Sequence, residues 1–491
     1  MDFPDMGILT LLLMLPLFGA ALVAAMPSDS ERAIRSIALV TGLLTLAIAW
    51  GLLLSFDVQL HGMQFAEIHR WNPRMGTSFA LGVDGFSLPM VLLATLLSFV
   101  AILASGNIRQ STKIYYLLML VLEAAMLGVF LAQDWALFYV FWELTLIPLF
   151  FLIDRWGGAN RHGAALNFFL YTMGGSVFLL ISLLVLFDIV PGHSFSMAEI
   201  AKVAAALPEQ TQVLIFLGFL LGFGVKMPIF PIHGWLPLAH VEAPSPVSIL
   251  LSGILLKMGS YGLIRATGTL PDGVSALQGV LIALALVSLI YGGLLAWRQS
   301  DLKAMIAYSS VSHMGVVLVG IAALNVAGLT GAVMQMVAHG LVAGALFLLI
   351  GLMYERTHTR NIDDYSSLVR VTPRFAVLTT LAFVAAVSLP GTVGFIAELH
   401  ALIGGFQRWG WLVVLLSLGV MISAAYAIRT VGRLFTGPVS ARMRHIPDLR
   451  GVEMVAASVL TAGIVLLGLF PAPALRLVSA SVSHFSSVFG V

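Results

Sequence analysis

Residues 226–265 read KMPIFPIHGWLPLAHVEAPSPVSILLSGILLKMGSYGLIR. The stretch places a lysine at the end of each of two long apolar runs, Lys226 in one and Lys257 in the other. A charged side chain near the centre of a bilayer costs at least about 2.5–3.5 kcal/mol, so such residues usually face the interior of a helical bundle and serve function. The stretch therefore predicts a polytopic membrane protein with titratable groups at membrane depth.

The composition of the whole chain supports this class. Of 491 residues, 59% are hydrophobic and only 10% are charged, whereas soluble domains carry about 25% charged residues. An ordinary soluble enzyme and a disordered chain are therefore excluded. The absence of cysteine excludes disulfides, iron–sulfur clusters, thiolate zinc sites and a cysteine nucleophile. The net charge of +2 predicts no nucleic-acid partner.

The apolar runs are long and continuous, which predicts membrane-spanning helices rather than the alternating strands of a barrel. The fold class is therefore all-α, with about fourteen transmembrane helices and a polar connector at 56–83. The predicted spans are 6–26, 34–55, 84–105, 114–132, 134–153, 164–189, 211–232, 244–267, 274–296, 303–324, 328–353, 373–405, 410–434 and 453–472.

Basic residues are distributed unevenly between the connectors. Those after odd-numbered spans hold 17 Lys and Arg residues, and those after even-numbered spans, with the C-terminus, hold 6. The remaining two are Lys226 and Lys257. Because cytoplasmic loops are enriched in Lys and Arg, both termini are predicted on the extracytoplasmic side.

Two of the predicted spans contain helix breaks. Pro228 and Pro231 interrupt the seventh span, so the Gly224 carbonyl must find a new partner. Pro390 interrupts the twelfth span, eight residues before Glu398. The breaks are five spans apart, which predicts two inverted five-helix repeats, spans 4–8 and 9–13. The predicted divisions are 1–113 (helices 1–3 with the connector), 114–267 (first repeat), 268–436 (second repeat) and 437–491 (loop and helix 14).

Three carboxylates accompany the lysines inside apolar runs: Glu123, Glu143 and Glu398. Lysine and glutamate titrate readily once desolvated, which is what a proton relay requires. A Lys–Glu pair about 6 Å apart at an effective dielectric of about 20 interacts by roughly 2.8 kcal/mol, or about 2 pKa units. Opening such a pair could move a lysine between holding and releasing its proton. The alternative interpretation is a set of structural ion pairs.

Histidines lie on polar helix faces in two further spans. Ser309 and His313 share a face, as do Gln335 and His339. Together with Lys257 these residues could form a hydrated polar line. Haem ligation by His313 and His339, or simple core histidines bonded to backbone carbonyls, are the alternatives. His233 lies in the seventh-span break.

Several motifs resemble those of a known family. Beside the stretch 226–265 they are FWELTLIPLFFLI (141–153), DLKAMIAYSSVSHMG (301–315), QMVAHGL (335–341), YERTHTR (354–360) and LPGTVGFIAE (389–398). They resemble the antiporter-like membrane-arm subunits of respiratory complex I, the proton-translocating NADH:quinone oxidoreductase. In that family the twelfth span carries lysine in the L and N types and glutamate in the M type, also called subunit 4. Glu398 therefore indicates the M type.

The resemblance implies roles for individual residues. Glu143 and Lys226 would be the paired switch of the first half-channel, and Lys257 the connecting lysine. His313 and His339 would belong to the central hydrophilic axis, which ends at Glu398. The secondary residues are Glu123, which matches a frequent fourth-span carboxylate, and His233 in the broken-helix loop.

The resemblance also implies partners and a location. Redox energy released in partner subunits would drive proton transfer, so NADH, FMN, iron–sulfur clusters and quinone are expected there, with no cofactor and no metal in this chain. The partners would be the L-, N-, K-, J-, A- and H-type membrane-arm subunits, the peripheral arm and the lipid bilayer of a bacterial inner (plasma) membrane. The alternatives are a subunit of a multisubunit sodium/proton antiporter and the membrane arm of a hydrogenase- or ferredoxin-linked relative.

Overall fold

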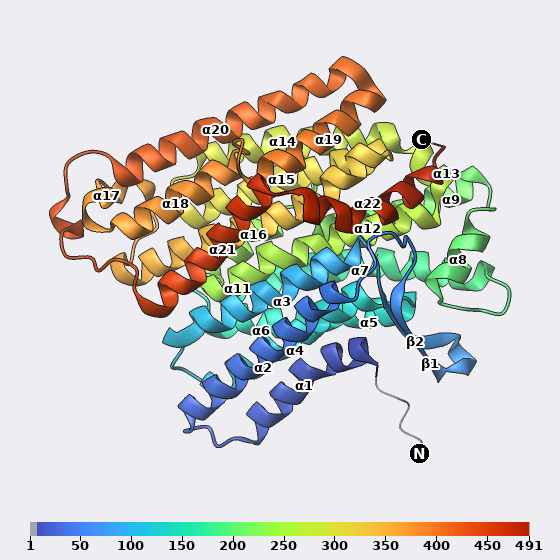
Figure 1. Ribbon diagram of the computed structural model, residues 1–491, viewed down its shortest axis with the longest axis horizontal. Helices are drawn as coiled ribbons and strands as arrows, with labels where there is room; N and C mark the ends of the chain where they lie inside the picture. The colour runs from blue at the N-terminus through green and yellow to red at the C-terminus, as the bar shows by residue number, and fades with distance from the viewer. Residues whose placement is uncertain (1–6, 491) are drawn as a thin grey trace.

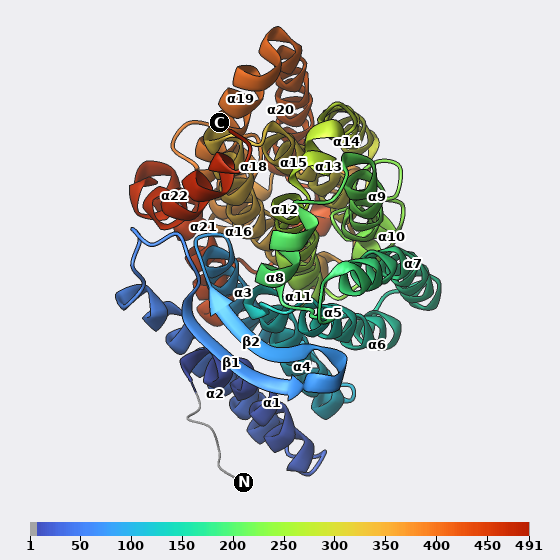
Figure 2. The same ribbon diagram turned by 90° about the vertical axis from the view of Figure 1, so that its right-hand side faces the viewer.

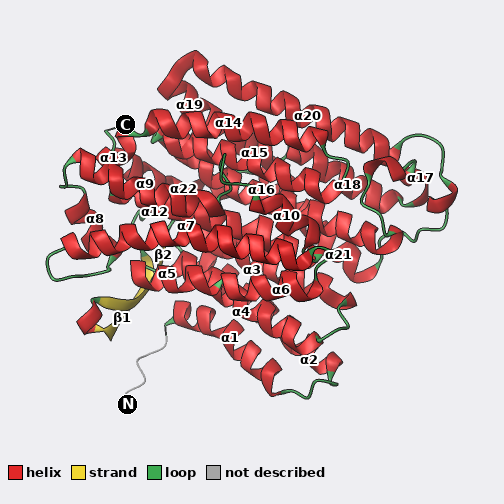
Figure 3. Ribbon diagram, turned by 180° about the vertical axis from the view of Figure 1, so that it is seen from behind, coloured by secondary structure: helices red, strands yellow, loops and turns green. Residues whose placement is uncertain are grey.

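The computed structural model describes residues 7–490, which form a bundle of long helices with one β-hairpin (Figures 1 and 3). The longer helices are α1 (Ile8–Ala25), α2 (Glu31–Gly51), α3 (Ser87–Ala104), α4 (Thr112–Leu131), α5 (Trp135–Leu144), α6 (Leu146–Trp156), α7 (Arg161–Ile189), α9 (Glu209–Lys226), α12 (Leu256–Thr269), α14 (Gln278–Arg298), α15 (Leu302–Ala323), α16 (Val326–Thr357), α18 (Pro373–Ala386), α19 (Val393–Trp409), α20 (Val414–Phe435), α21 (Gly451–Leu469) and α22 (Ala472–Ser487). The shorter ones are α8 (Met197–Ala204), α10 (Trp235–Glu242), α11 (Ser245–Leu250), α13 (Pro271–Ala276) and α17 (Leu368–Val371).

The bundle confirms the predicted polytopic membrane class. Within residues 7–490, twelve helical segments are long and apolar enough to cross a membrane. The other two predicted spans, 211–232 and 373–405, correspond to the pairs α9/α10 and α18/α19, each of which is interrupted. The inverted relation of the two repeats and the four-part division of the chain stay predictions.

Both interruptions coincide with the predicted prolines. Residues 227–234 leave the helix after α9 and contain Pro228 and Pro231, and residues 387–392 contain Pro390. The Gly224 carbonyl accepts a hydrogen bond from the Ile229 amide at 3.0 Å. The Val225 carbonyl accepts one from the Trp235 indole at 2.8 Å. The protein itself thus satisfies these carbonyls of the first break.

Helices at the centre of the bundle are almost fully buried. The apolar window of the segment from α11 to α12 is 100% buried, and those of α15 and α16 are 94% buried. The windows of α2, α20 and α21 are only 33% buried. An end-on view places α1 and α2 at one edge and α19 and α20 at the other, with α12, α15 and α16 between them (Figure 2). Polar side chains on α12, α15 and α16 therefore lie away from lipid.

The predicted polar connector 56–83 contains a β-hairpin, which was not predicted from the sequence. It contains β1 (Gln64–Asn72) and β2 (Thr77–Val83), an antiparallel pair with His69 opposite Phe79. The hairpin crosses one end of the bundle, called the hairpin end below, where α1 begins and α22 ends (Figures 1 and 2). The Glu67 carboxylate accepts the Leu9 and Thr10 amides at 2.7 and 2.9 Å, so β1 caps the positive end of the α1 dipole.

Candidate functional site

Lys226 lies in the last turn of α9, immediately before the break, and is buried. Its Nζ donates hydrogen bonds to Thr145 Oγ1 at 2.8 Å and to the Trp142 carbonyl at 3.3 Å. It also lies 3.9 Å from the centroid of the Trp142 ring, which is within the range of a cation–π contact. The junction of α5 and α6 therefore holds this amine.

Glu143 lies between Trp142 and Thr145 in sequence, but it does not contact the lysine. Within residues 7–490 no ion pair of 4.0 Å or less joins Glu143 to Lys226. Glu143 is half-buried, and its Oε1 has no hydrogen-bond partner in the described protein. The structure thus places the two residues predicted to pair on neighbouring segments, with the pair open.

Glu123 on α4 is fully buried, and neither of its carboxyl oxygens has a hydrogen-bond partner among the described residues. A buried polar group without a partner is costly. The structure buries Glu123 within the bundle but does not join it to the lysines.

Lys257 has a different environment. It follows η4 (Leu251–Leu255), a π-helical turn between α11 and α12, and such turns are frequent at functional sites. Its Nζ donates to the Ser252 carbonyl in that turn and lies against His339 Nδ1, both at 2.6 Å. Lysine and histidine are thus in direct contact across α12 and α16.

His339 leads on to His313 and Glu398. The two imidazole centroids are 5.4 Å apart, and His313 Nδ1 lies 3.7 Å from Glu398 Oε1. Gln335 Nε2 also lies 3.3 Å from His313 Nδ1. We call Lys257, His339, His313 and Glu398 the central axis. It connects α12, α16, α15 and α19, so the structure brings these four residues together.

A small cavity adjoins the two imidazoles, with room for about one water molecule. Three polar atoms of its lining residues have no hydrogen-bond partner in the described protein: Gln335 Oε1, His339 Nε2 and Ser388 Oγ. A buried water typically needs two to four polar partners. The cavity offers these partners beside the two imidazoles, whose ring centroids are 5.4 Å apart.

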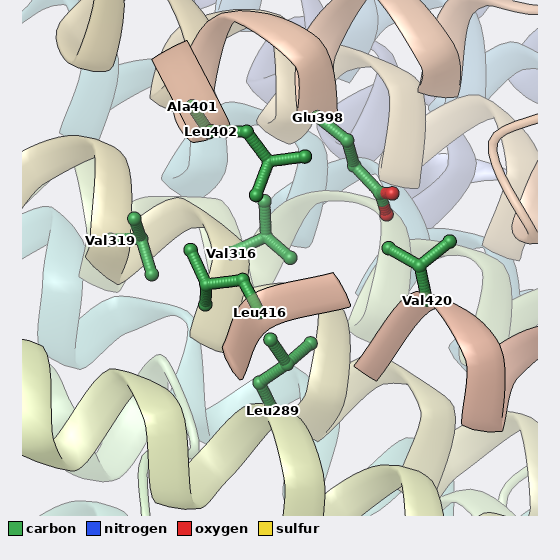
Figure 4. A pocket seen from close by; sticks show the side chains of 8 residues that line it. All are labelled: Leu289, Val316, Val319, Glu398, Ala401, Leu402, Leu416 and Val420. Carbon is green, nitrogen blue, oxygen red and sulfur yellow. The ribbon is translucent and has the colours of Figure 1, made fainter. Parts of the chain in front are cut away.

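Glu398 ends the axis in apolar surroundings. Its side chain lines a pocket with seven apolar side chains from α14, α15, α19 and α20 (Figure 4): Leu289, Val316, Val319, Ala401, Leu402, Leu416 and Val420. The carboxylate is the polar group of this lining, so any charge that it carries is compensated from the His313 side.

His233 lies apart from the central axis. It is in the first break, its ring is 5.7 Å from that of Tyr291, and its Nδ1 has no partner in the described chain.

Two further buried groups were assigned no role in the sequence analysis. His240 on α10 stacks on Phe347 at 4.5 Å, and neither ring nitrogen has a hydrogen-bond partner in the described protein. Lys303, which the sequence analysis counted as a loop residue, is buried in the first turn of α15 and donates to the Ala243 carbonyl at 2.7 Å. Little in the sequence indicated that His240 and Lys303 are buried, because both lie near the ends of apolar runs.

Comparison with known proteins gives a consistent result. Residues 132–423 match the family described as NADH:quinone oxidoreductase/Mrp antiporter, transmembrane. The chain is 41% identical to NAD(P)H-quinone oxidoreductase chain 4 2 of Thermosynechococcus vestitus, covering 96% of this chain and 89% of that protein. It is 40% identical to NADH-quinone oxidoreductase subunit M of Rhodobacter capsulatus, covering 97% and 96% respectively.

Solved structures share the fold. A chain of respiratory complex I from Thermus thermophilus aligns with a TM-score of 0.90 and 31% identity, over 99% of this chain and 100% of that one. A chain of the Mrp complex from a Dietzia species aligns with a TM-score of 0.83 at 23% identity, over 98% of this chain and 55% of that one, which shows a common fold alone.

Proposed function

Because the chain belongs to the NADH:quinone oxidoreductase/Mrp antiporter transmembrane family, it is an antiporter-like membrane-arm subunit of a quinone oxidoreductase, and we propose that the central axis is its proton path. In this proposal protons move between Lys257 and Glu398 by way of His339 and His313. The chain itself carries out no redox chemistry, and NADH, FMN, iron–sulfur clusters and quinone belong to partner subunits.

One observation carries the proposal: four buried titratable side chains from four helices follow one another in a line, and three of them lie on the most buried helices, α12, α15 and α16. Contacts of 2.6 and 3.7 Å join the two ends of the axis to its imidazoles. Each imidazole has two nitrogens and can take up a proton on one while releasing a proton from the other. The spacing therefore suits stepwise proton transfer.

Lys226 and Glu143 act in this proposal as a switch beside the axis. With the amine on Thr145 and Trp142 the pair is open. Movement of the amine toward Glu143 would stabilise the charged lysine, and return to Thr145 would favour release of its proton. The protonation state of Lys257 biases this equilibrium through the electrostatic coupling of nearby charges.

The finer assignments follow the same proposal. The partners are other subunits of the complex, with the L-, N-, K-, J-, A- and H-type membrane subunits and the peripheral arm as specific candidates. The location is a bacterial inner membrane, with the hairpin end extracytoplasmic, as the distribution of Lys and Arg residues favours.

The alternatives fit less well. The Mrp complex shares the fold, but the more similar relatives are chain 4 and subunit M proteins. Haem ligation by His313 and His339 is disfavoured because the cavity beside them has room for only about one water molecule.

Lys257→Met tests the proposal in the purified complex reconstituted in proteoliposomes. A positioned acid–base group typically contributes about 10²–10⁴-fold to proton transfer, so we expect coupled proton pumping to fall by at least about 100-fold. Lys202→Met, at an exposed lysine of α8, is the matched control. Normal pumping per quinone reduced in the Lys257→Met complex would contradict the proposal.

A further inference from the structure

A second polar column starts from the central axis and leads to the hairpin end. Lys257, Tyr261 and Arg265 repeat every four residues on one face of α12. Arg265 is two helical turns from the lysine, or about 12 Å along the helix. At the hairpin end, Nη1 and Nη2 of Arg265 donate to the two carboxylate oxygens of Asp84, each at 2.8 Å. A direct route from the axis to the hairpin end would run through this pair.

Each group in the column makes hydrogen bonds within the protein. The Tyr261 hydroxyl donates to the Phe130 carbonyl at 3.2 Å and accepts from Arg265 Nε at 3.0 Å. Asp84 also accepts the backbone amides of Phe86 and Ser87, each at 3.0 Å. The column is therefore closed by bonds within the protein.

None of these groups is suited to pass on a proton. Arginine is not deprotonated in proteins and has no acceptor site. The hydroxyl hydrogen of Tyr261 is directed at a carbonyl. Asp84 precedes α3. Burial opposes its ionisation, but Arg265 and the backbone amides together hold its pKa below the ordinary value. A carboxylate held in this way is a poor proton acceptor.

The C-terminal helix covers this end of the column. Ser481 Oγ on α22 accepts the Gly85 amide at 2.9 Å, and Phe485 packs edge-on against Phe86 at 5.3 Å. Side chains of α22 thus pack on the two residues that follow Asp84, and the pair is largely shielded from water, with the Arg265 side chain 12% and the Asp84 side chain 5% exposed.

We infer that Arg265, Asp84 and Tyr261 form a proton-insulating seal, which prevents a proton on Lys257 from leaking along α12 to the hairpin end and directs it toward Glu398. This inference rests on the proposed function of the axis. The seal acts by placing groups that cannot exchange protons on the direct route, while the exchangeable groups lie on the lateral route through His339 and His313.

Replacing the arginine with a titratable residue tests the seal. Arg265→His keeps a donor beside Asp84 but can take up and release a proton near neutral pH. We test the reconstituted complex under an imposed potassium diffusion potential and without electron donor. The ordinary pKa of histidine lies several units below that of arginine, and each unit changes the ease of proton release by a factor of ten. We therefore expect the variant to conduct protons about tenfold faster or more. If Arg265→His does not assemble, Arg265→Lys serves as the same test, because lysine also titrates when buried.

Two further variants distinguish a seal from a merely structural pair. Asp84→Asn/Arg265→Met fills the site with neutral side chains that cannot relay protons, so its conductance should stay at the wild-type level. Lys257→Met added to Arg265→His should abolish the leak, because the leak starts at the axis. An assembled Arg265→His complex without a leak, an equal leak in the neutral double variant, or a leak that survives Lys257→Met would each overturn the inference. These passive measurements are independent of coupled pumping, which tests the proposed function.

Discussion

Lys226 and Lys257 are both buried in the bundle, but their amines are held in different ways. Lys257 touches a titratable partner, His339, at 2.6 Å. Lys226 is held by the neutral groups of Thr145 and Trp142, while its predicted carboxylate partner stays apart. The first arrangement can hand a proton to a neighbour directly, whereas the second must move before any exchange. The comparison suggests that the axis around Lys257 is the path and that Lys226 is a gate beside it.

The two lysines also differ in how their regions are anchored. The column that begins at Lys257 ends in the buried ion pair of Arg265 and Asp84. Neither lysine has an ion-pair partner within 4.0 Å in the part of the chain that the structure describes. The helix that carries Lys257 is therefore anchored by an ion pair two turns away, whereas the Lys226 amine is held by neutral hydrogen bonds.

The largest expected effect is on stability, from Asp84→Asn. Removing one partner of a buried ion pair leaves the other charge uncompensated and typically costs about 3–5 kcal/mol. We expect a clearly lower melting temperature of the detergent-solubilised complex. Because the pKa of Asp84 is lowered in the folded protein, the wild-type pair contributes fully above the ordinary aspartate pKa of about 3.9 and loses its contribution as the pH falls below it.

The neutral double variant Asp84→Asn/Arg265→Met provides the control for this acid sensitivity. It should recover much of the melting temperature at neutral pH and lack the acid-dependent loss that this pair causes. Equal acid sensitivity in wild type and double variant would show that the pair does not anchor the region.

The next effect is on transport, from His339→Leu, which interrupts the axis at its contact with Lys257. We expect coupled proton pumping to fall by about 100-fold, since a positioned proton carrier is lost. Proton uptake into proteoliposomes per quinone reduced measures this, with His445→Leu, at an exposed connector histidine, as the control. Normal pumping in the His339→Leu complex would contradict the assignment of the Lys257 axis as the path and of Lys226 as the gate.

Much of this arrangement could be predicted from the sequence. Apolar run length predicted the spans, and Pro228, Pro231 and Pro390 predicted both breaks, because proline removes a helical donor wherever it lies. The shared faces of Gln335 with His339 and of Ser309 with His313 predicted a polar line. Local rules sufficed for all of these.

The remaining features depend on packing between distant segments. The contact of Lys257 with His339 joins residues 82 positions apart, and the hold of Thr145 on Lys226 involves a neutral side chain with no distinctive pattern. The hairpin at 64–83 was missed because its two strands do not show a regular alternation of buried and exposed residues. Lys303 was counted with the loop residues because it lies at the very edge of an apolar run, two positions after Asp301.

The smallest effect, from Thr145→Val, separates the two lysines most sharply. Valine keeps the shape but removes the 2.8 Å acceptor of the Lys226 amine. A hydrogen bond to a charged group is worth about 1.5–3 kcal/mol. The open state of the switch should lose part of this hydrogen-bond energy. We therefore expect coupled pumping to slow by up to roughly tenfold. Thr461→Val, at a buried threonine bonded to its own helix, is the control. If the two lysines differ as proposed, Glu143→Gln should abolish the effect of Thr145→Val, because no carboxylate then competes for the amine. If the losses of pumping from Thr145→Val and Glu143→Gln were additive in the double variant, the proposed role of Lys226 as a gate would be contradicted.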